Sequence, residues 1–318
     1  MKKLMFIATG GTIASGDSGN GLTPEITAEE LLGGVSVADA EVHAVQPFAL
    51  DSTDLTPQHW TELAKLIRDG WQDYDGFVIA HGTDTMAYGA AALSCLIQGA
   101  GKPIILTGSQ LPMSDPDTDA RRNLSDALLC AKRGRAGVWV SFCGRVIAGN
   151  ATRKVHTRDF DAFRGFTPED EFTVEGSLTD GMDDDTCTVF YNRLDPSVAV
   201  LKLTPGISAE MVREMGTHVR ALIIEGFGMG GVPDYGSGEL AQALLELAAC
   251  GVRVIMTTQV FQGGCDLSVY AVGKAATRAG VIPAEGMTTE YAVMRAMWAL
   301  ANSYDLDNFK HLFLGKKR

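Results

Sequence analysis

The sequence predicts a two-domain α/β protein, with a larger N-terminal domain built on a parallel or mixed sheet and a smaller C-terminal Rossmann-like α/β domain. Short apolar runs alternate with amphipathic segments along most of the chain, which is typical of a parallel sheet covered by helices. Several of these runs stop at glycine or threonine, as buried parallel strands do at tight turns. With 318 residues, 46 % of them hydrophobic, the chain can form two cores.

The N-terminal alternation predicts five strands and four helices in order. Strands are expected over residues 4–8, 41–47, 76–80, 103–106 and 137–142. Helices are expected over residues 27–32, 56–69, 85–98 and 119–132. Thr56 followed by Pro57 is typical of an N-cap with proline at the first helical position, so it fixes the start of one helix.

A second α/β rhythm follows an irregular stretch over residues 145–173 and an acidic triplet at 183–185. Strands are expected over residues 198–203, 221–225 and 252–257, and helices over 208–216, 239–250 and 288–301. We therefore expect an N-terminal catalytic domain over 1–185, a linker over 186–198 and a C-terminal domain over 199–318.

Charge and composition exclude several function classes. The net charge of −12 argues against binding to nucleic acid or to an anionic membrane surface. No apolar run is long enough to cross a bilayer, and the first residues lack a signal-peptide pattern, so we expect a cytoplasmic protein. The six cysteines are scattered without a Cys-x-x-Cys pair, which predicts reduced thiols and no zinc site.

Two of the predicted strands are followed by a turn in which a threonine comes after glycine. Thr12 comes after Gly10 and Gly11, and Thr83 comes after Gly82. The carboxyl ends of strands are where open α/β sheets build their sites, so two hydroxyls delivered there favour nucleophilic chemistry. Helix capping is the alternative for Thr12, and Asp84 has the same alternative at the start of the helix expected over 85–98.

A hydroxyl becomes a good nucleophile only when a base takes its proton. Lys154 is a candidate for that base, directly or by relay, provided that its surroundings favour the neutral amine; the alternative is an ordinary surface lysine. A Gly-x-Gly-x-x-Gly match at residues 226–231 would suggest a dinucleotide site. A helix should then follow at once, but Pro233 and Asp234 intervene, so a loop is favoured.

Several motifs resemble those of the bacterial-type L-asparaginase family over nearly the whole chain. TGGTIA at residues 9–14 and HGTDTM at residues 81–86 resemble its two threonine signatures. TGSQ at 107–110 with DARRNL at 119–124 is similar to its middle segment. GVI at 280–282 and MTTE at 287–290 resemble the C-terminal stretch of its cytoplasmic type I branch.

This resemblance implies hydrolysis of the side-chain amide of L-asparagine, with weaker action on glutamine, and no metal or cofactor. Thr12 would attack the amide carbon and form a β-aspartyl ester, while Thr83, Asp84 and Lys154 would form a second triad that handles protons. The implied substrate contacts come from the backbone at Gly11 and Gly82, from Ser52 and Thr53 to the α-carboxylate, from Asp84 to the α-ammonium and from Ser109 to the side-chain amide.

The chain departs from the family pattern beside the first threonine. Many members carry a tyrosine on the following mobile loop, whereas residues 15–24 contain none and Leu22 stands at that position. Thr23, Ser18 or the Lys154 arm would then have to activate Thr12. The glycine-rich loop still suits a lid that closes over substrate.

The resemblance also implies a homodimer or homotetramer in which a neighbouring chain completes the pocket. The loops over 226–234 and 259–266 would supply those residues, with Gln259 and Asp266 as candidates and Met229 where asparagine is often found. Two other functions remain open: an ammonia-releasing subunit of a tRNA-dependent amidotransferase, disfavoured by a chain that starts on the catalytic strand, and a non-catalytic amino-acid sensor. The preference between asparagine and glutamine is open as well, because one methylene discriminates by only about 1–3 kcal/mol.

Overall fold

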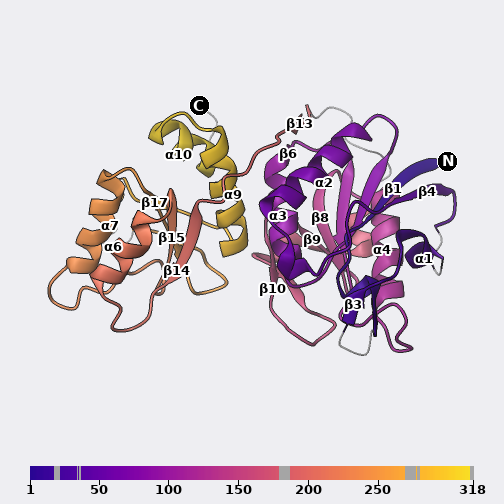
Figure 1. Cartoon of the computed structure of the whole chain (residues 1–318), viewed down its shortest axis with the longest axis horizontal. Helices are drawn as coiled ribbons and strands as arrows, with labels where there is room; N and C mark the ends of the chain where they lie inside the picture. The colour runs from indigo at the N-terminus through magenta and orange to yellow at the C-terminus, as the bar shows by residue number, and fades with distance from the viewer. Residues whose placement is uncertain are drawn as a thin grey trace. The chain divides into compact units, whose positions relative to one another are not determined.

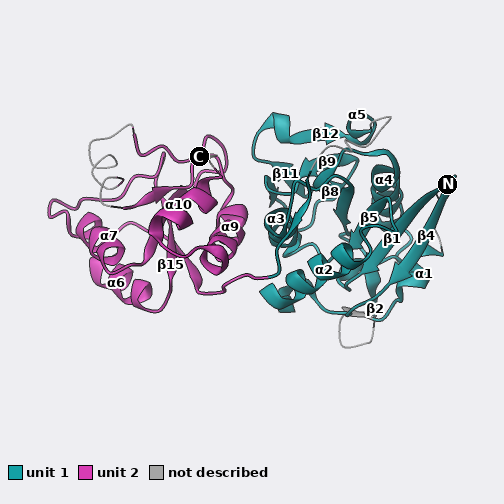
Figure 2. Cartoon of the chain, turned by 90° about the horizontal axis from the view of Figure 1, so that it is seen from above, with its two compact units in different colours: residues 1–192 teal, residues 193–318 magenta. Residues whose placement is uncertain are grey.

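The computed structural model describes residues 1–17, 22–33, 35, 37–178, 187–268, 277 and 280–315 (Figure 1). It divides into two compact units, Met1–Asn192 and Arg193–Arg318 (Figure 2). Each unit is an α/β domain, the larger with a mixed sheet and the smaller with a parallel one, so the predicted fold class is confirmed. Within these residues no helix combines the length and apolar character needed to cross a bilayer.

The sheet of the first unit has seven strands in the order β12-β9-β8-β7-β5-β1-β4. The five predicted strands form its parallel part, and β9 and β12 extend it antiparallel at one edge. Their bounds are β1 Lys2–Ala8, β4 Ala40–Val45, β5 Gly76–Ala80, β7 Pro103–Thr107, β8 Gly137–Phe142, β9 Arg145–Ala148 and β12 Glu171–Thr173.

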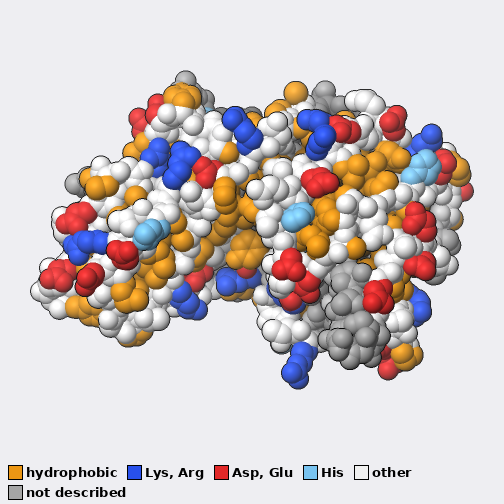
Figure 3. All heavy atoms as spheres, in the orientation of Figure 1, with side chains coloured by type: hydrophobic (Ala, Val, Ile, Leu, Met, Phe, Trp, Pro, Cys, Tyr) orange, Lys and Arg blue, Asp and Glu red, His pale blue; other side chains and the backbone are white. Residues whose placement is uncertain are grey.

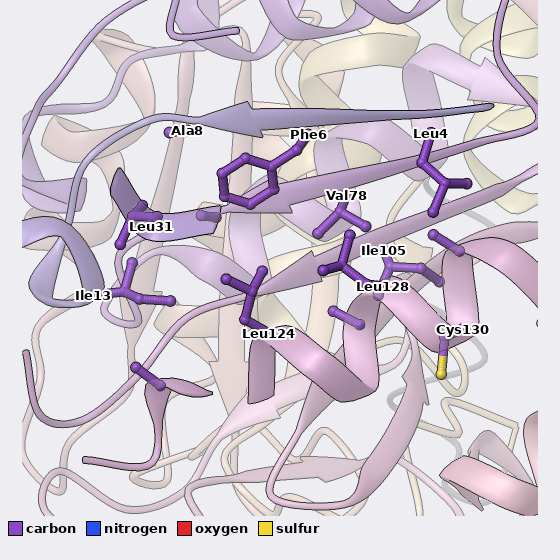
Figure 4. Packing of buried hydrophobic residues seen from close by; sticks show 14 of the residues in the cluster. Leu4, Phe6, Ala8, Ile13, Leu31, Val78, Ile105, Leu124, Leu128 and Cys130 are labelled. Carbon is purple, nitrogen blue, oxygen red and sulfur yellow. The ribbon is translucent and has the colours of Figure 1, made fainter. Parts of the chain in front are cut away.

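Helices cover both faces of this sheet. Figure 1 shows α2 (Pro57–Asp69) and α3 (Met86–Leu96) on one side, and α1 (Ala28–Leu32) and α4 (Ala120–Arg133) on the other. Alternate strand residues enter the core beneath α1 and α4, where Leu4, Phe6 and Val78 meet Leu31, Leu124 and Leu128 (Figure 4). The strand residues between them, such as Ile7 and Ile79, are also fully buried, so both faces of the sheet are covered.

Short elements complete the first unit. The strands are β2 Ser15–Asp17, β3 Leu22–Pro24, β6 Ile97–Gln98, β10 Thr152–Lys154, β11 Phe163–Gly165 and β13 Val189–Phe190, and the helices are η1 Thr12–Ala14, η2 Ser52–Asp54, η3 Pro168–Asp170 and α5 Val174–Ser177. Two expectations need correction. The helix expected to reach residue 98 ends at Leu96, because Ile97–Gln98 pairs with β13; the same pairing shows that Val189–Phe190 is strand, not linker.

The second unit contains four parallel strands in chain order: β14 Val198–Lys202, β15 Ala221–Gly226, β16 Arg253–Thr258 and β17 Ile282–Pro283. Helices α6 (Ala209–Thr217) and α7 (Glu239–Ala249) pack on one face of this sheet through residues such as Val212, Leu244 and Leu247. Helix α9 (Thr289–Asn302) packs against β14 and β15, and α10 (Leu306–Leu314) packs on α9.

Charged side chains of both signs are interspersed on the face of the molecule drawn in Figure 3. The whole chain carries a net charge of −12, and the described residues on this face form no continuous basic surface of the kind that binding to nucleic acid requires.

Candidate active site

The two threonine signatures lie at the carboxyl ends of neighbouring strands. β1 and β5 pair in parallel up to Ala8 and Ala80, and the Thr9 hydroxyl then donates to the Ala80 carbonyl at 2.9 Å. Gly11 continues past the sheet and its N–H donates to the Leu50 carbonyl at 3.0 Å. Thr9 is therefore a structural residue, and the chain turns into the site after it.

Gly11 and Gly82 bring the two strand ends into direct backbone contact. A Cβ atom on Gly11 would lie 2.3 Å from the Gly82 Cα, and one on Gly82 would lie 2.6 Å from the Ser52 Cβ. Gly11 also has φ 74°, a conformation that favours glycine. This contact brings the turns that precede Thr12 and Thr83 together, and the buried Ser52 lies against Gly82.

Gly11→Ala is expected to destabilise the protein by at least about 2 kcal/mol, because the methyl group adds backbone strain and meets the Gly82 backbone. Turnover by the remaining folded protein should fall as well. Gly206→Ala is the matched control: φ is +89°, yet nothing lies within 4 Å of the added Cβ. It should cost about 1 kcal/mol and leave turnover unchanged. Urea unfolding and ammonia release measure both; equal effects at the two positions would contradict the close contact.

Thr12 opens the short helix η1, whose N-cap position belongs to Gly11. Its side chain is partly exposed, and no residue in the described part of the chain hydrogen-bonds to its hydroxyl. The nearby Ser15 hydroxyl is engaged, because it donates to the Gly11 carbonyl at 2.9 Å. Thr12 is therefore the first residue of η1 and not its cap.

Thr83, Lys154 and Asp84 form a hydrogen-bonded triad. The Lys154 Nζ donates to the Thr83 Oγ1 at 2.8 Å and to the Asp84 Oδ1 at 2.6 Å. The Thr83 residue is 6 % exposed and the Lys154 side chain 17 %, whereas the Asp84 side chain is 60 % exposed. The N-cap position of α3 belongs to Thr85, and the Asp84 carboxylate faces Lys154 and solvent. Lys154 is thus a partly buried site residue.

Lys154 reaches the triad from the hairpin of β10 and β11. Val155 closes this hairpin by donating to the Ala162 carbonyl at 2.8 Å. Asp161, next to Ala162, binds Arg145 at 3.0 Å and Arg164 at 2.5 Å. The two guanidinium groups, Arg164 first, lower the pKa of Asp161 from 3.8 to about 2.

Asp161 should therefore stabilise the protein above about pH 4, and this contribution should disappear as the pH falls from 3.8 towards 2. The sign follows from the lowered pKa, since the unfolded chain takes up a proton first. The side chain is 34 % exposed, so we expect no more than about 1 kcal/mol. Urea unfolding of wild type and Asp161→Asn should differ at pH 7 and converge near pH 2; a difference that persists at the lower pH would contradict this assignment.

The residues expected to contact the substrate differ in their burial and in the hydrogen bonds that their hydroxyls make. Ser52 lies in η2 against Gly82, and its carbonyl accepts from the Thr85 hydroxyl at 2.7 Å. Thr53 is exposed, and its hydroxyl donates to Asp51 at 2.7 Å, which lowers the pKa of that carboxyl. Ser109 is fully buried and its hydroxyl donates to the Leu111 carbonyl at 2.5 Å. Ser52 thus joins the two threonines, whereas the hydroxyls of Thr53 and Ser109 are bonded within their own loops.

A carboxylate that the sequence analysis left without a role shapes the loop after β7. Asp119 accepts hydrogen bonds from the N–H groups of Gln110 and Leu111 and from the Asn123 side chain, at 2.9 to 3.2 Å. Asn123 is buried and also donates to the Gly108 carbonyl at 3.0 Å. The only sequence signal for this network is the i, i+4 spacing of Asp119 and Asn123 at the start of α4.

His81 supports the second strand end without entering the triad. Its ring is fully buried, and burial lowers its pKa to about 4, so it is neutral near pH 7. The Nδ1 atom lies 2.7 Å from the Gly82 carbonyl, which assigns the ring proton to Nδ1. Across the described residues, no cluster of three or more His, Cys, Asp or Glu side chains is arranged to hold a metal.

Two loops of the second unit, over residues 226–234 and 259–266, were expected to meet a neighbouring chain. Gln259 donates to the Leu203 and Glu225 carbonyls at 2.7 and 3.0 Å, so its amide joins strand ends of its own sheet. Met229 is exposed. The glycine-rich stretch at 226–231 is a tight loop, and α7 begins only at Glu239, which confirms the loop interpretation.

The loop expected to act as a lid is described in part. Ser18 lies outside the described residues. Leu22 and Thr23 belong to β3, which pairs antiparallel with β2.

Comparison with known proteins adds to this geometry. Two family models match the chain, "Asparaginase, N-terminal" over residues 3–178 and "Glutaminase/Asparaginase C-terminal domain" over residues 197–313. A curated L-asparaginase of Thermococcus kodakarensis is 36 % identical over 98 % of this chain and 96 % of the relative. A solved structure of the thermostable L-asparaginase from the same organism has a TM-score of 0.88 at 35 % identity, covering 98 % of this chain and 96 % of that one. A glutamyl-tRNA(Gln) amidotransferase subunit of Pyrococcus horikoshii is 35 % identical over 97 % of this chain and 74 % of its own length.

Proposed function

This chain belongs to the asparaginase family, and on that premise we propose that it hydrolyses L-asparagine to aspartate and ammonia through a threonine nucleophile. The observation that carries the proposal is the Gly11–Gly82 backbone contact, which joins the turn that bears Thr12 to the turn that bears the hydrogen-bonded Thr83, Lys154 and Asp84. Neither strand end alone offers both a nucleophile and a group to handle its proton.

In the proposed mechanism the Thr12 oxygen attacks the side-chain amide carbon of asparagine. The C–N bond breaks, the nitrogen leaves as ammonia after receiving a proton, and a β-aspartyl ester on Thr12 remains. A water molecule then attacks the ester carbon, the bond to Thr12 breaks and aspartate leaves. Backbone N–H groups near Gly11 and Thr83 stabilise the oxyanion in both steps, where one such donor is typically worth about 2.7–4 kcal/mol.

Substrate recognition uses both charges of the amino acid. Asp84 is largely exposed on one side of the triad and binds the α-ammonium group. Ser52 receives the α-carboxylate, and Thr53 joins it once its hydroxyl turns from Asp51. When both charges are held, the side-chain amide lies at Thr12, so part of the binding energy is used to position the reacting groups. Ser109 has its hydroxyl bonded to Leu111, so it would reach the amide only after turning.

Thr83 and Lys154 together perform the proton transfer for which many family members use a tyrosine, a residue that the segment 15–24 lacks. Support comes from the distances, since Lys154 bonds to Thr83 at 2.8 Å and is mostly buried. In this scheme Lys154 acts as the neutral amine. The Thr83 hydroxyl takes the proton of Thr12, turns its own proton toward the Lys154 nitrogen and passes it there, and Lys154 later returns a proton to the leaving ammonia.

Steady-state kinetics with L-asparagine, L-glutamine and D-asparagine test the proposed function. We expect ammonia and aspartate from L-asparagine, weaker release from L-glutamine and the least from D-asparagine, whose α-substituents are exchanged in space. Binding of L-asparagine without ammonia would indicate an amino-acid sensor and overturn the proposal.

The second candidate function is the ammonia-releasing subunit of a tRNA-dependent amidotransferase. The comparisons favour keeping it, because the P. horikoshii relative is 35 % identical, close to the 36 % of the asparaginase. Turnover of free asparagine by the chain alone decides for the hydrolase. Ammonia release that needs a partner subunit and charged tRNA decides for the amidotransferase.

We further propose that the protein works in the cytoplasm as a homodimer or homotetramer, with residues of a neighbouring chain near the site. The Gln259 amide is already bonded within its own sheet, so Gln259 is a weaker candidate for such a residue than its sequence position suggested. Light scattering coupled to size-exclusion chromatography would give the oligomeric state, and a fully active monomer would remove the neighbouring chain from the proposal.

A further inference from the structure

Gln110 lies between two segments that the proposed reaction needs at a fixed separation. It belongs to the loop that follows β7, and its backbone N–H is held by both carboxylate oxygens of Asp119, at 3.0 and 3.1 Å. The main chain of Gln110 is therefore held independently of its side chain.

The Gln110 amide group has a defined orientation. Its Nε2 donates to the Asp159 carbonyl at 2.8 Å, and its Oε1 lies 3.5 Å from the Thr83 Oγ1. A carbonyl oxygen can only accept, so the nitrogen must face Asp159 and the oxygen must face Thr83. The contact to Asp159 is the strong one, because 3.5 Å is at the upper limit for a hydrogen bond.

Asp159 is part of the segment between β10 and β11, and Lys154 is the last residue of β10. The Gln110 amide consequently joins the loop after β7 to the hairpin that delivers Lys154. At the other end of the amide, Thr83 accepts a hydrogen bond from Lys154, which leaves the Thr83 proton directed at the Gln110 oxygen.

We propose that Gln110 is a positioning residue that clamps the Lys154 hairpin and orients the Thr83 hydroxyl. This inference rests on the proposed function, because the clamp matters for the rate only if Lys154 and Thr83 move protons. Gln110 itself touches neither the nucleophile nor, in this proposal, the reacting amide. Loss of the clamp should therefore change kcat and leave substrate binding nearly intact.

Gln110→Met has a similar length and lacks both hydrogen-bonding groups. We expect it to lower kcat for asparagine about 5- to 10-fold and to leave KM within about twofold of wild type. The fall in kcat corresponds to the loss of one such hydrogen bond from the transition state. Gln98→Met is the matched control, since the Gln98 amide also donates to one backbone carbonyl, that of Cys95 at 3.0 Å, but in β6. It should keep both constants.

Gln110→Glu separates the two contacts of the side chain. A carboxylate still accepts from Thr83 but cannot donate to Asp159, so the clamp proposal expects kcat to fall as far as in Gln110→Met. Wild-type kcat in Gln110→Glu, wild-type kcat in Gln110→Met, or a rise in KM alone in either variant would overturn the proposal. Equal melting temperatures of the variants and wild type, measured in the same buffer, ensure that the rates compare folded proteins.

Hydrogen exchange supplies a readout that does not depend on asparagine turnover. The Val155 N–H group, which donates to the Ala162 carbonyl inside the hairpin, should exchange faster in Gln110→Met than in wild type or Gln98→Met. If wild type released no ammonia, the proposed function would fail while this comparison could still show the clamp. Unchanged exchange at Val155 would overturn the clamp whatever the protein hydrolyses.

Discussion

Thr12→Ala is expected to reduce asparagine hydrolysis by at least about 10⁴-fold while the protein remains folded, because removal of a catalytic nucleophile leaves only binding and oxyanion stabilisation. The Thr12 hydroxyl has no hydrogen bond to any residue that the structure describes, so its loss leaves no buried partner unpaired. The free energy of unfolding should change by less than about 0.5 kcal/mol. Ammonia release and urea unfolding on the same preparation test the two parts.

Thr9→Ala is the matched control for that variant. Thr9 lies three residues earlier at the same strand end, but it is 1 % exposed and its hydroxyl donates to Ala80. Its loss should cost about 1 kcal/mol of stability and leave most of the turnover. The two threonines should thus show opposite patterns. A Thr12→Ala protein within about tenfold of the wild-type rate would move the nucleophile elsewhere.

Lys154→Met is expected to lower kcat by about 10²- to 10⁴-fold, the usual contribution of a positioned acid or base. The reason is local: Lys154 is the group that bonds to both Thr83 and Asp84, and methionine can neither accept nor return a proton. KM should change less than kcat, since Asp84 remains to bind the α-ammonium group. Steady-state kinetics measure the change, and Lys65→Met, on the exposed side of α2, should behave as wild type.

Lys154→Arg distinguishes proton transfer from charge. Arginine keeps the positive charge beside Asp84 but does not release its proton at working pH. If Lys154 handles protons, this variant should be nearly as slow as Lys154→Met. A Lys154→Arg protein with more than about half of the wild-type kcat would reduce the role of Lys154 to holding Asp84.

The main elements of the fold followed from local patterns. Residues 76–80 and 137–142 are strands with the predicted bounds, since each is an apolar run that begins at a glycine. The irregular stretch over 145–173 contains β9, β10, β11 and β12, which have three or four residues each and include charged ones. Strands of this kind are held by pairing and ion pairs with distant segments, so their own sequence gives little signal. Helix α10 did carry a signal, in the Asp305 N-cap and the spacing of Phe309 and Phe313.

The candidate site was only partly accessible to the sequence. The glycine–threonine pairs at two strand ends indicated Thr12 and Thr83, and Lys154 was already a candidate base from its residue type. The family resemblance joined Lys154 and Asp84 to Thr83 as a triad. The roles of Asp119 and Gln110 could not be predicted, because their partners depend on how a loop, a helix start and a hairpin meet. Burial of the Ser109 hydroxyl was equally hidden, because it depends on how the loop that follows β7 folds and brings up the Leu111 carbonyl.

The contact between Gly11 and Gly82 has a consequence for redesign. The distance between the two glycine turns is set by main chain against main chain, and neither glycine has a side chain that could be trimmed to change it. A protein engineer who wants room for one more methylene, as in glutamine, cannot obtain it between the two strand ends. The room has to come from residues outside this contact.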